Sequence, residues 1–210
     1  AGRAVSLLSS ADNQVRSFLA EDGDFFLATN SRTLVERFFE VGENGESLAT
    51  TPAFLLSRQL MPLERNDTSF TYFSPAMLRG LVAPEYLIEL RRRLQAKSDV
   101  AMVHLARLTS AQEPIESADP LRGIDQLVEA GFLPAGFGRR PDGSGAIAVG
   151  EEVLDTLRGA RGSFLPIADV RIDAVTAEES AWYSQIASQY SQRFPTFDPI
   201  MVGIQRQTFE

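Results

Sequence analysis

The stretch FFLATNS, residues 25–31, decides the fold, because the hydrophobic pattern changes there from the period of a strand to that of a helix. Residues 25–28 are apolar at every position, which predicts a strand that is covered on both faces and lies centrally in its sheet. Asn30 or Ser31 can then cap a helix. The apolar residues that follow have helical spacing: Leu34, Val35, Phe38, Phe39 and Val41. The stretch therefore predicts a strand that leads directly into a helix.

The residues before this stretch predict two more strands. Residues 4–9 are apolar and short, residues 11–14 form a turn cluster, and residues 15–20 alternate between the two faces of a strand. Asp22-Gly23-Asp24 contains the Asp-Gly pair that is typical of a tight hairpin turn. The first thirty residues therefore predict a meander of three antiparallel strands.

The residues after the stretch repeat the same order of elements. Thr51-Pro52 opens a helix, residues 69–73 alternate as a strand, and Ser74-Pro75 opens another helix. Two strands joined through helices predict an α+β protein, in which helices pack on one face of an antiparallel-rich sheet.

The longest predicted helix runs from Pro84 to about Ser110. Apolar residues recur along it at intervals of three, four or seven residues: Leu87, Leu90, Leu94, Ala101, Leu105 and Leu108. This stripe predicts the face that packs on the rest of the protein. Arg91, Arg92 and Arg93 lie beside the stripe, and an alternative use of this arginine-rich helix is as a surface for a partner.

The second half of the chain has a different character. A polar break at residues 112–120 predicts a boundary between an α+β unit, residues 1–112, and a glycine-rich, irregular unit, residues 113–210, which can also share the same core. Eight of the fifteen glycines lie between residues 131 and 166. The glycine-rich sequence at residues 136–145 predicts an exposed loop.

The rest of this half predicts short elements. Thr176 and Glu179 form a capping box, which predicts a helix that runs to about Arg193. The other predicted elements are a helix at residues 120–130 and strands at residues 146–149, 170–175 and 200–209. Because the last strand stays apolar almost to the end of the sequence, we expect the chain to be a piece of a longer protein.

Composition excludes several classes of site. The chain has 210 residues, no cysteine and one histidine, His104, which excludes disulfides, thiolate metal sites, iron–sulfur clusters and multi-histidine metal sites. The formal net charge of -8 disfavours binding to a phosphate backbone. No apolar run approaches the roughly 18 residues needed to span a bilayer. We therefore expect no cofactor, no metal ion, no nucleic-acid partner and no membrane-spanning segment.

The sequence also lacks the templates of catalysis. A phosphate-binding P-loop and the Gly-x-Ser-x-Gly nucleophile motif are both absent. Residues 136–138 begin like a dinucleotide-binding fingerprint, but Pro141 takes the place of its third glycine. Asp67-Thr68-Ser69 is similar to the corner of an aspartic protease, yet one copy supplies one carboxylate where two are needed. We therefore expect no catalytic residue.

Residues 25–31, 51–54 and 69–73 follow a recurring order: a short strand that ends in small polar residues, a helix, a Thr-Pro-x-Phe helix, and a further strand. This order resembles that of a bacterial family of uncharacterised, envelope-associated proteins. The resemblance covers residues 4–82, and residues 157–166 are similar to stretches of large uncharacterised proteins of GC-rich bacteria. It implies an extracytoplasmic or envelope location. Because the family carries no established activity, the resemblance transfers no functional residue.

Together these features predict a non-catalytic structural or binding module of a larger bacterial protein. Its partner is then another protein or a neighbouring domain of the same chain. An alternative is a hydrolase or a small-ligand-binding domain that uses the loop at residues 136–145, because loops of this composition often carry function. Arg139, Arg140 and Asp142 are the candidate ligand-binding residues of that alternative.

Overall fold

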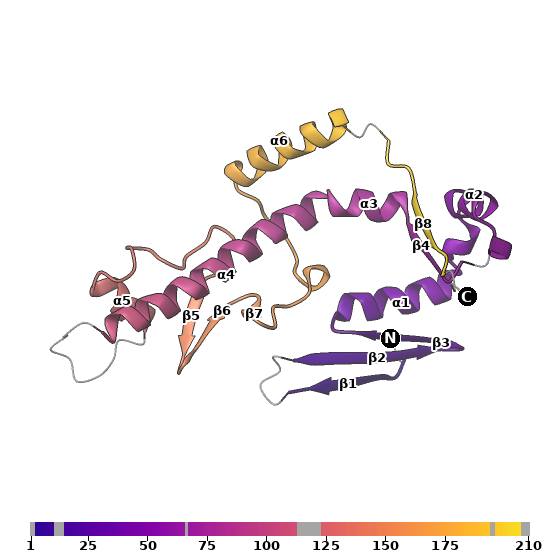
Figure 1. The fold of residues 1–210 in the computed structure, drawn as a ribbon. Helices are drawn as coiled ribbons and strands as arrows, with labels where there is room; N and C mark the ends of the chain where they lie inside the picture. The colour runs from indigo at the N-terminus through magenta and orange to yellow at the C-terminus, as the bar shows by residue number, and fades with distance from the viewer. Residues whose placement is uncertain (1–2, 11–14, 66, 113–122, 194–195, 207–210) are drawn as a thin grey trace.

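The computed structural model describes residues 3–10, 15–65, 67–112, 123–193 and 196–206, and these form an α+β protein. The described residues contain six α-helices and three small antiparallel sheets (Figure 1). None of the described helices combines the length and the apolar character needed to cross a membrane. The predicted α+β class is confirmed, with the strands divided among three sheets.

The N-terminal sheet is a meander of β1 (Val5–Ser9), β2 (Arg16–Asp22) and β3 (Phe25–Thr29), in that order. Gly23 turns the chain between β2 and β3 with a φ of 61°, a backbone conformation that favours glycine. The helix α1 (Arg32–Asn44) packs on β2 and β3 (Figure 1).

The prediction that residues 25–28 form a central, fully covered strand is wrong. The third strand of a meander is an edge strand, so β2 is the central one. Phe25 and Phe26 are 73% and 67% exposed, because β3 has an open edge and α1 covers only one face of the sheet. The apolar run therefore marks an exposed surface. The turn predicted at residues 11–14 lies outside the described residues.

Two side chains cap the N-terminus of α1. The Ser31 hydroxyl accepts a hydrogen bond from the backbone amide of Leu34 at 3.2 Å, as the sequence predicts. Asp169 belongs to a short 3-10 helix, Ile167–Asp169, far along the chain. Its carboxylate accepts from two amides of the first turn of α1, at 3.0 and 2.9 Å, and from the Ser31 hydroxyl at 2.6 Å. The cap thus ties the second half of the chain to the N-terminal sheet.

The second sheet joins two distant parts of the chain. β4 (Ser69–Phe73) pairs in antiparallel fashion with β8 (Ile200–Ile204). The helix α2 (Pro52–Leu60) packs on this sheet through an edge-to-face pair of Phe54 and Tyr72, whose ring centroids are 5.1 Å apart. β3 and β4 therefore lie in separate sheets, whereas the sequence pattern predicts that helices connect them within one sheet.

The long helix α4 (Pro84–Ser110) has the predicted bounds and runs through the middle of the molecule (Figure 1). The helix α3 (Pro75–Leu81) leads into it, and Ser74 caps α3 as predicted. The helix α6 (Ala177–Arg193) packs beside the N-terminal half of α4. A short helix and the third sheet complete the group around α4: α5 (Ile124–Glu129), β5 (Ala146–Val149), β6 (Glu152–Asp155) and β7 (Gly159–Ala160).

The apolar stripe predicted to pack lies largely on the exposed side of α4. Leu94, Leu105 and Leu108 are 62%, 63% and 63% exposed. The opposite side of the helix is buried and mixes apolar residues with charged ones, such as Ile88, Val100 and Val103 with Glu89 and Asp99. The buried side contributes to the main core cluster, which consists of Val100, Val103, Ala106, Leu127, Leu133 and Val153.

Two further predictions concern the C-terminal half. Residues 170–175 form no strand in the described structure, so that prediction is wrong. The capping box is confirmed: the amide of Thr176 donates to the Glu179 carboxylate at 2.9 Å, and the amide of Glu179 donates to the Thr176 hydroxyl at 3.1 Å. Most of the polar break lies outside the described residues. The packing of β6 on α4 crosses the predicted boundary, and the division into two units stays a prediction.

The molecule is elongated and leaves much of its surface uncovered (Figure 1). Its accessible surface area is 14551 Å². A compact folded chain of 23.1 kDa exposes about 9,700 Å² by the scaling of area with mass. The difference of about 4,900 Å² is surface that a compact monomer of this mass would bury.

Candidate functional site

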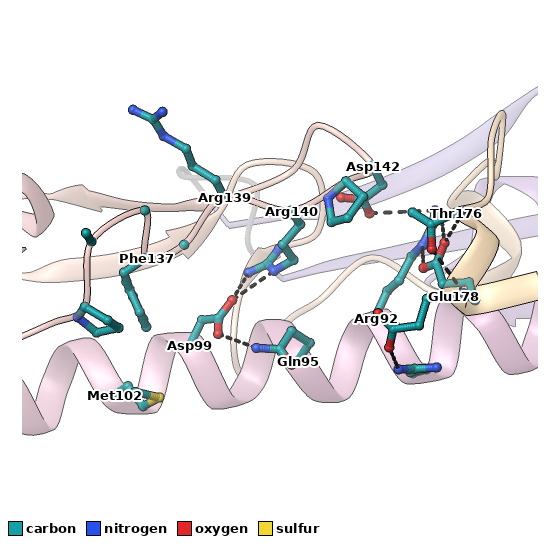
Figure 2. Close-up of a pocket in the computed structure, with 17 residues that line it drawn as sticks. Arg92, Gln95, Asp99, Met102, Phe137, Arg139, Arg140, Asp142, Thr176 and Glu178 are labelled. Atoms are coloured by element: carbon teal, nitrogen blue, oxygen red, sulfur yellow. Dashed lines mark hydrogen bonds and ion pairs between the residues drawn. The ribbon is translucent and has the colours of Figure 1, made fainter. Parts of the chain in front are cut away.

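A groove of about 550 Å³ lies where the loop at residues 134–142 crosses α4 (Figure 2). The first turn of α6 also lines it. Gly136 and Gly138 have φ angles of 76° and 77°, which glycine adopts without the strain that a side chain would add. The glycine-rich sequence therefore allows this loop to fold back along the helix.

Arg158 is the centre of a network of ion pairs beside this groove. It lies in the turn between β6 and β7 and has no solvent-exposed surface. Its Nε and Nη2 atoms donate to the two carboxylate oxygens of Glu89 on α4, each at 2.8 Å. Asp142 and Asp155 lie 3.1 and 3.4 Å from the same guanidinium. Burial lowers the pKa of Arg158, but the hydrogen bond to Glu89 and the other carboxylates outweigh it and raise the pKa, so the group stays charged.

Arg140 extends from the loop into the same network. Its Nε donates to Asp99 of α4 at 2.9 Å, and its Nη1 donates to the Ser144 hydroxyl at 2.9 Å. It also forms an ion pair with Asp155, which it shares with Arg158. Asp99 accepts a further hydrogen bond from Gln95 at 2.8 Å. Arg140 therefore fastens the loop to the helix.

Asp142 closes the loop on itself and joins it to two arginines. One carboxylate oxygen accepts from the amide and the hydroxyl of Ser144, at 3.0 and 2.6 Å. The other oxygen lies 3.1 Å from Arg158 and 3.7 Å from Arg92. Burial raises the pKa of Asp142, but the hydrogen bonds from Ser144 and Arg158 outweigh it and hold the pKa below the ordinary value of 3.8. The carboxylate is therefore ionised at neutral pH.

Arg92 connects the network to α6. Its Nε and Nη2 atoms donate to the two oxygens of Glu179, at 2.7 and 2.8 Å, and Nη2 also donates to the carbonyl of Ala174 at 2.8 Å. The hydrogen bond from Arg92 lowers the pKa of Glu179, and burial only partly opposes this. Such a bidentate pair fixes the orientation of both groups, so it holds the start of α6 against α4.

The three candidate residues of the loop have different surroundings. Arg140 and Asp142 lie within the ion-pair network, whereas the side chain of Arg139 is exposed and points away from α4 (Figure 2). A second cavity of about 750 Å³ is lined by Arg139 and Arg140 and by the loop backbone that follows them. The structure thus gives Arg140 and Asp142 internal partners and leaves Arg139 facing the solvent.

Sequence patterns alone missed Glu89, Asp99 and Arg158. A signal for the first two is present, because Glu89, Arg92 and Asp99 share one helix face with the buried Val103. Charged residues on the same helix face as a core residue are themselves buried. They indicate a buried ion pair where residues of opposite charge lie near that face. Arg158 gives no comparable signal, since it lies in a turn and an arginine in a turn is ordinarily exposed.

The charged groups of the network are paired with one another and leave one negative charge in excess. The network contains four arginines and five carboxylates: Arg92, Arg93, Arg140, Arg158, Glu89, Asp99, Asp142, Asp155 and Glu179. Each of these groups has an oppositely charged partner within the network. In the part of the chain that the structure describes, no three His, Asp or Glu side chains are placed so as to hold a metal ion. This arrangement fixes the loop and α6 on α4.

No protein-family model, no curated protein and no solved structure matches this chain. The resemblance to envelope-associated proteins, with the location that it implies, therefore stays a prediction from the sequence.

Proposed function

We propose that this chain is a non-catalytic binding module of a larger bacterial protein and that it acts by contact with another polypeptide. One observation carries the proposal: the charged groups beside the groove are paired with one another, whereas large apolar side chains are exposed on several elements. A catalytic site has the reverse arrangement, with reactive groups left available to a substrate.

The protonation states support a structural role for the network. Asp142 and Glu179 have lowered pKa values, so neither holds a proton that it can donate at neutral pH. The one imidazole of the chain, His104, is exposed on α4 and does not line the groove. These groups therefore offer no acid–base pair that converges on the groove.

The apolar surface supports a protein partner. Exposed large apolar side chains occur on β1, β3, α2, α4 and β8. On β8 they are Ile200, Val202 and Ile204, which alternate along the strand and so share one face of the β4–β8 sheet. Contiguous exposed apolar surface of this kind is typical of interaction sites.

A small-ligand site is the second candidate, because the groove of about 550 Å³ is large enough for a drug-sized molecule. Arg139 is the residue that separates the two proposals. Substitution of Arg140 or Asp142 breaks the ion-pair network and lowers stability with or without a ligand, whereas Arg139→Ala leaves the network intact.

The test is thermal unfolding in the presence of phosphate, sulfate, simple mono- and dicarboxylates, and divalent cations. If the chain is a binding module, we expect none of these ligands to give the wild type a saturable rise in melting temperature that Arg139→Ala loses. The matched control is Arg171→Ala, since the Arg171 side chain is 90% exposed and lies outside the groove. A saturable rise that Arg139→Ala removes and Arg171→Ala keeps overturns the proposal in favour of a ligand site.

A further inference from the structure

A second groove, of about 590 Å³, lies between α1 and the β1 side of the N-terminal sheet, apart from the ion-pair network. Its floor is apolar: Val5 and Phe18 line it from the sheet, and Val35 and Phe39 line it from α1. We call it the α1–β1 groove. It is open because α1 packs on β2 and β3, and this leaves the same face of β1 without a covering helix (Figure 1).

One helix is too narrow to cover a sheet of three strands. A helix with its side chains is about 10–12 Å in diameter and neighbouring strands are about 4.8 Å apart, so α1 covers about two strands. Leu7 of β1 is in register with Phe18, so it lies on the face that α1 packs against, and Val5 lies two residues before it on the same face. Val5 and Leu7 are nevertheless 37% and 55% exposed. This part of the sheet therefore lacks the second layer that ordinarily buries an apolar face.

The wall that α1 contributes to the groove carries a row of carboxylates. Glu36, Glu40 and Glu43 line the groove at spacings of four and three residues, which places them on one side of the helix. Their side chains are 55%, 58% and 62% exposed. The row is about 11 Å long, since each residue advances the helix by about 1.5 Å.

The neighbouring arginines only partly neutralise this row. Among the side chains that the structure describes around the groove, three arginines are paired with five carboxylates: Arg3, Arg32 and Arg37 with Asp22, Glu36, Glu40, Glu43 and Glu46. Arg3 and Arg37 are each shared by two carboxylates, and the contact of Glu40 with Arg37 is the longest of these pairs, at 3.4 Å. The groove thus combines an apolar floor with two negative charges in excess.

We infer that the α1–β1 groove binds a basic, amphipathic helix of the partner polypeptide. The inference rests on the proposed function and names the surface and the chemistry of its partner. The apolar side of such a helix covers the floor of the groove and Leu7. Lysine or arginine side chains along its flank, at spacings of three and four residues, meet the row of glutamates. Docking of an amphipathic helix into an apolar groove is a common mode of recognition.

Geometry and charge select this occupant. Two packed helices lie about 8–10 Å apart, so a helix beside α1 lies over β1, where the sheet is uncovered. Complementary charge favours a basic partner over an acidic one. It also disfavours a second copy of this chain, because the chain has a net charge of -8 and would bring the same acidic surface to the groove.

The first experiment uses a designed peptide as the probe. It is about 18 residues long, or five helical turns, with leucine on one side and lysine on the other. The control peptide carries glutamate in place of every lysine. Fluorescence anisotropy of the labelled peptides is measured against the whole 210-residue chain at physiological ionic strength. We expect saturable binding of the lysine peptide and at least about tenfold weaker binding of the glutamate peptide.

The second experiment separates the groove from the overall charge of the chain. Glu40→Lys reverses one charge of the row and is expected to weaken binding of the lysine peptide about tenfold. Glu129→Lys is the matched control, because it changes the net charge equally at an exposed residue of α5, far from α1 (Figure 1). Glu36→Lys, Glu40→Lys and Glu43→Lys together should reverse the preference, so that the glutamate peptide binds better. Misfolding of the variant cannot produce such a reversal.

The third experiment tests the floor of the groove with two leucines of one strand. Leu7 faces the α1 side of the sheet, whereas Leu8 faces the other side and is 77% exposed. Leu7→Ser is expected to weaken the lysine peptide about tenfold, because the bound helix covers that side chain. Leu8→Ser should leave the affinity unchanged.

The outcomes separate this inference from the proposed function. Equal losses of affinity for Glu40→Lys and Glu129→Lys, or for Leu7→Ser and Leu8→Ser, overturn the inference, since the peptide then binds without using the groove. Sedimentation of the chain alone tests a second copy as the occupant, and a dimer that Leu7→Ser dissociates overturns the inference as well. None of these results affects the proposal of a binding module, which fails only if a small ligand binds through Arg139.

Discussion

Arg158 remains charged although no part of it reaches solvent, because three carboxylates and one hydroxyl surround its guanidinium. Such a buried pair contributes little net stability when it is compared with a well-packed apolar core, since both ions lose their hydration. Removal of one partner has a different effect, because the other partner is then left as an unpaired buried charge. Glu89 is the group most affected, since Arg158 binds both of its oxygens and Arg93, at 3.3 Å, is the cation that would remain beside it.

We therefore expect Arg158→Met to lower the free energy of unfolding by about 3–5 kcal/mol. The double variant Arg158→Met with Glu89→Met should recover part of this loss, because it removes the buried carboxylate that has lost its bidentate partner. Urea denaturation of the single and double variants measures the coupling. Arg171→Met is the control, since it changes an exposed arginine and should alter stability by less than about 0.5 kcal/mol. A loss below about 1 kcal/mol for Arg158→Met contradicts the role assigned to this ion pair.

Among the elements, helix starts could be predicted from sequence, whereas the surroundings of strands and helices could not. Ser31, Ser74 and Thr176 each cap the helix predicted at that position, because a cap depends on residues within one turn. The exposure of β3 depends on which strands become its neighbours. The buried side of α4 depends on partners such as Arg158, which lies 69 residues from Glu89. Local patterns do not contain that information.

The same distinction applies to the candidate site. The loop at residues 136–145 was predicted from its glycines to be exposed, but the side chains of Arg140, Asp142 and Ser144 are buried where it meets α4. Their partners on α4 and in the turn after β6 could not be predicted, because each belongs to another element. The sequence therefore indicates the position of the loop but not the pairing that holds it.

Asp169 provides a test at the N-terminus of α1. Burial raises its pKa, but hydrogen bonds from Ser31 and from the backbone of α1 outweigh it and lower the pKa below the ordinary value of 3.8. The unfolded chain therefore takes up this proton first as the pH falls. The stability that Asp169 contributes is fully present above pH 3.8 and is lost as the pH falls towards its folded pKa.

We expect Asp169→Asn to lower the free energy of unfolding by about 1–2 kcal/mol at neutral pH, the range for a helix cap with its charge. The difference from the wild type should shrink as the pH falls below 3.8. Urea denaturation over a pH series measures both. Asp173→Asn is the matched control, because that side chain is 82% exposed and caps no helix. A difference that stays constant down to the lowest pH would exclude the ionised cap.

At the scale of the whole molecule, two regions differ in the packing and the ion pairs that stabilise them. The core cluster around α4 is closed by α5 and the third sheet and is reinforced by the ion-pair network. The β4–β8 sheet has two strands, and its outer face carries exposed isoleucine and valine side chains. A two-stranded sheet is marginally stable by itself.

Amide hydrogen exchange should therefore proceed in two stages. We expect β4 and β8 to exchange together and early, by local opening, whereas residues 96–106 of α4 exchange only with global unfolding. Mass spectrometry of peptic peptides resolves the two stages. Val103→Ala, which opens a cavity in the core cluster, should accelerate exchange in α4 and leave that of β4 and β8 unchanged. Equal protection of the two regions would contradict this division.

The turn that contains Arg158 also restricts how the polypeptide can misassemble. If the β6–β7 hairpin docked on α4 one residue out of step, the Arg158 guanidinium would lose its two hydrogen bonds to Glu89 and Glu89 would keep Arg93 as a counter-ion, at a cost of several kcal/mol for the buried arginine. A purely apolar contact would tolerate the same shift in register at a small cost in free energy. The ion pair between Arg158 and Glu89 therefore favours one register of the hairpin on α4 over the neighbouring registers.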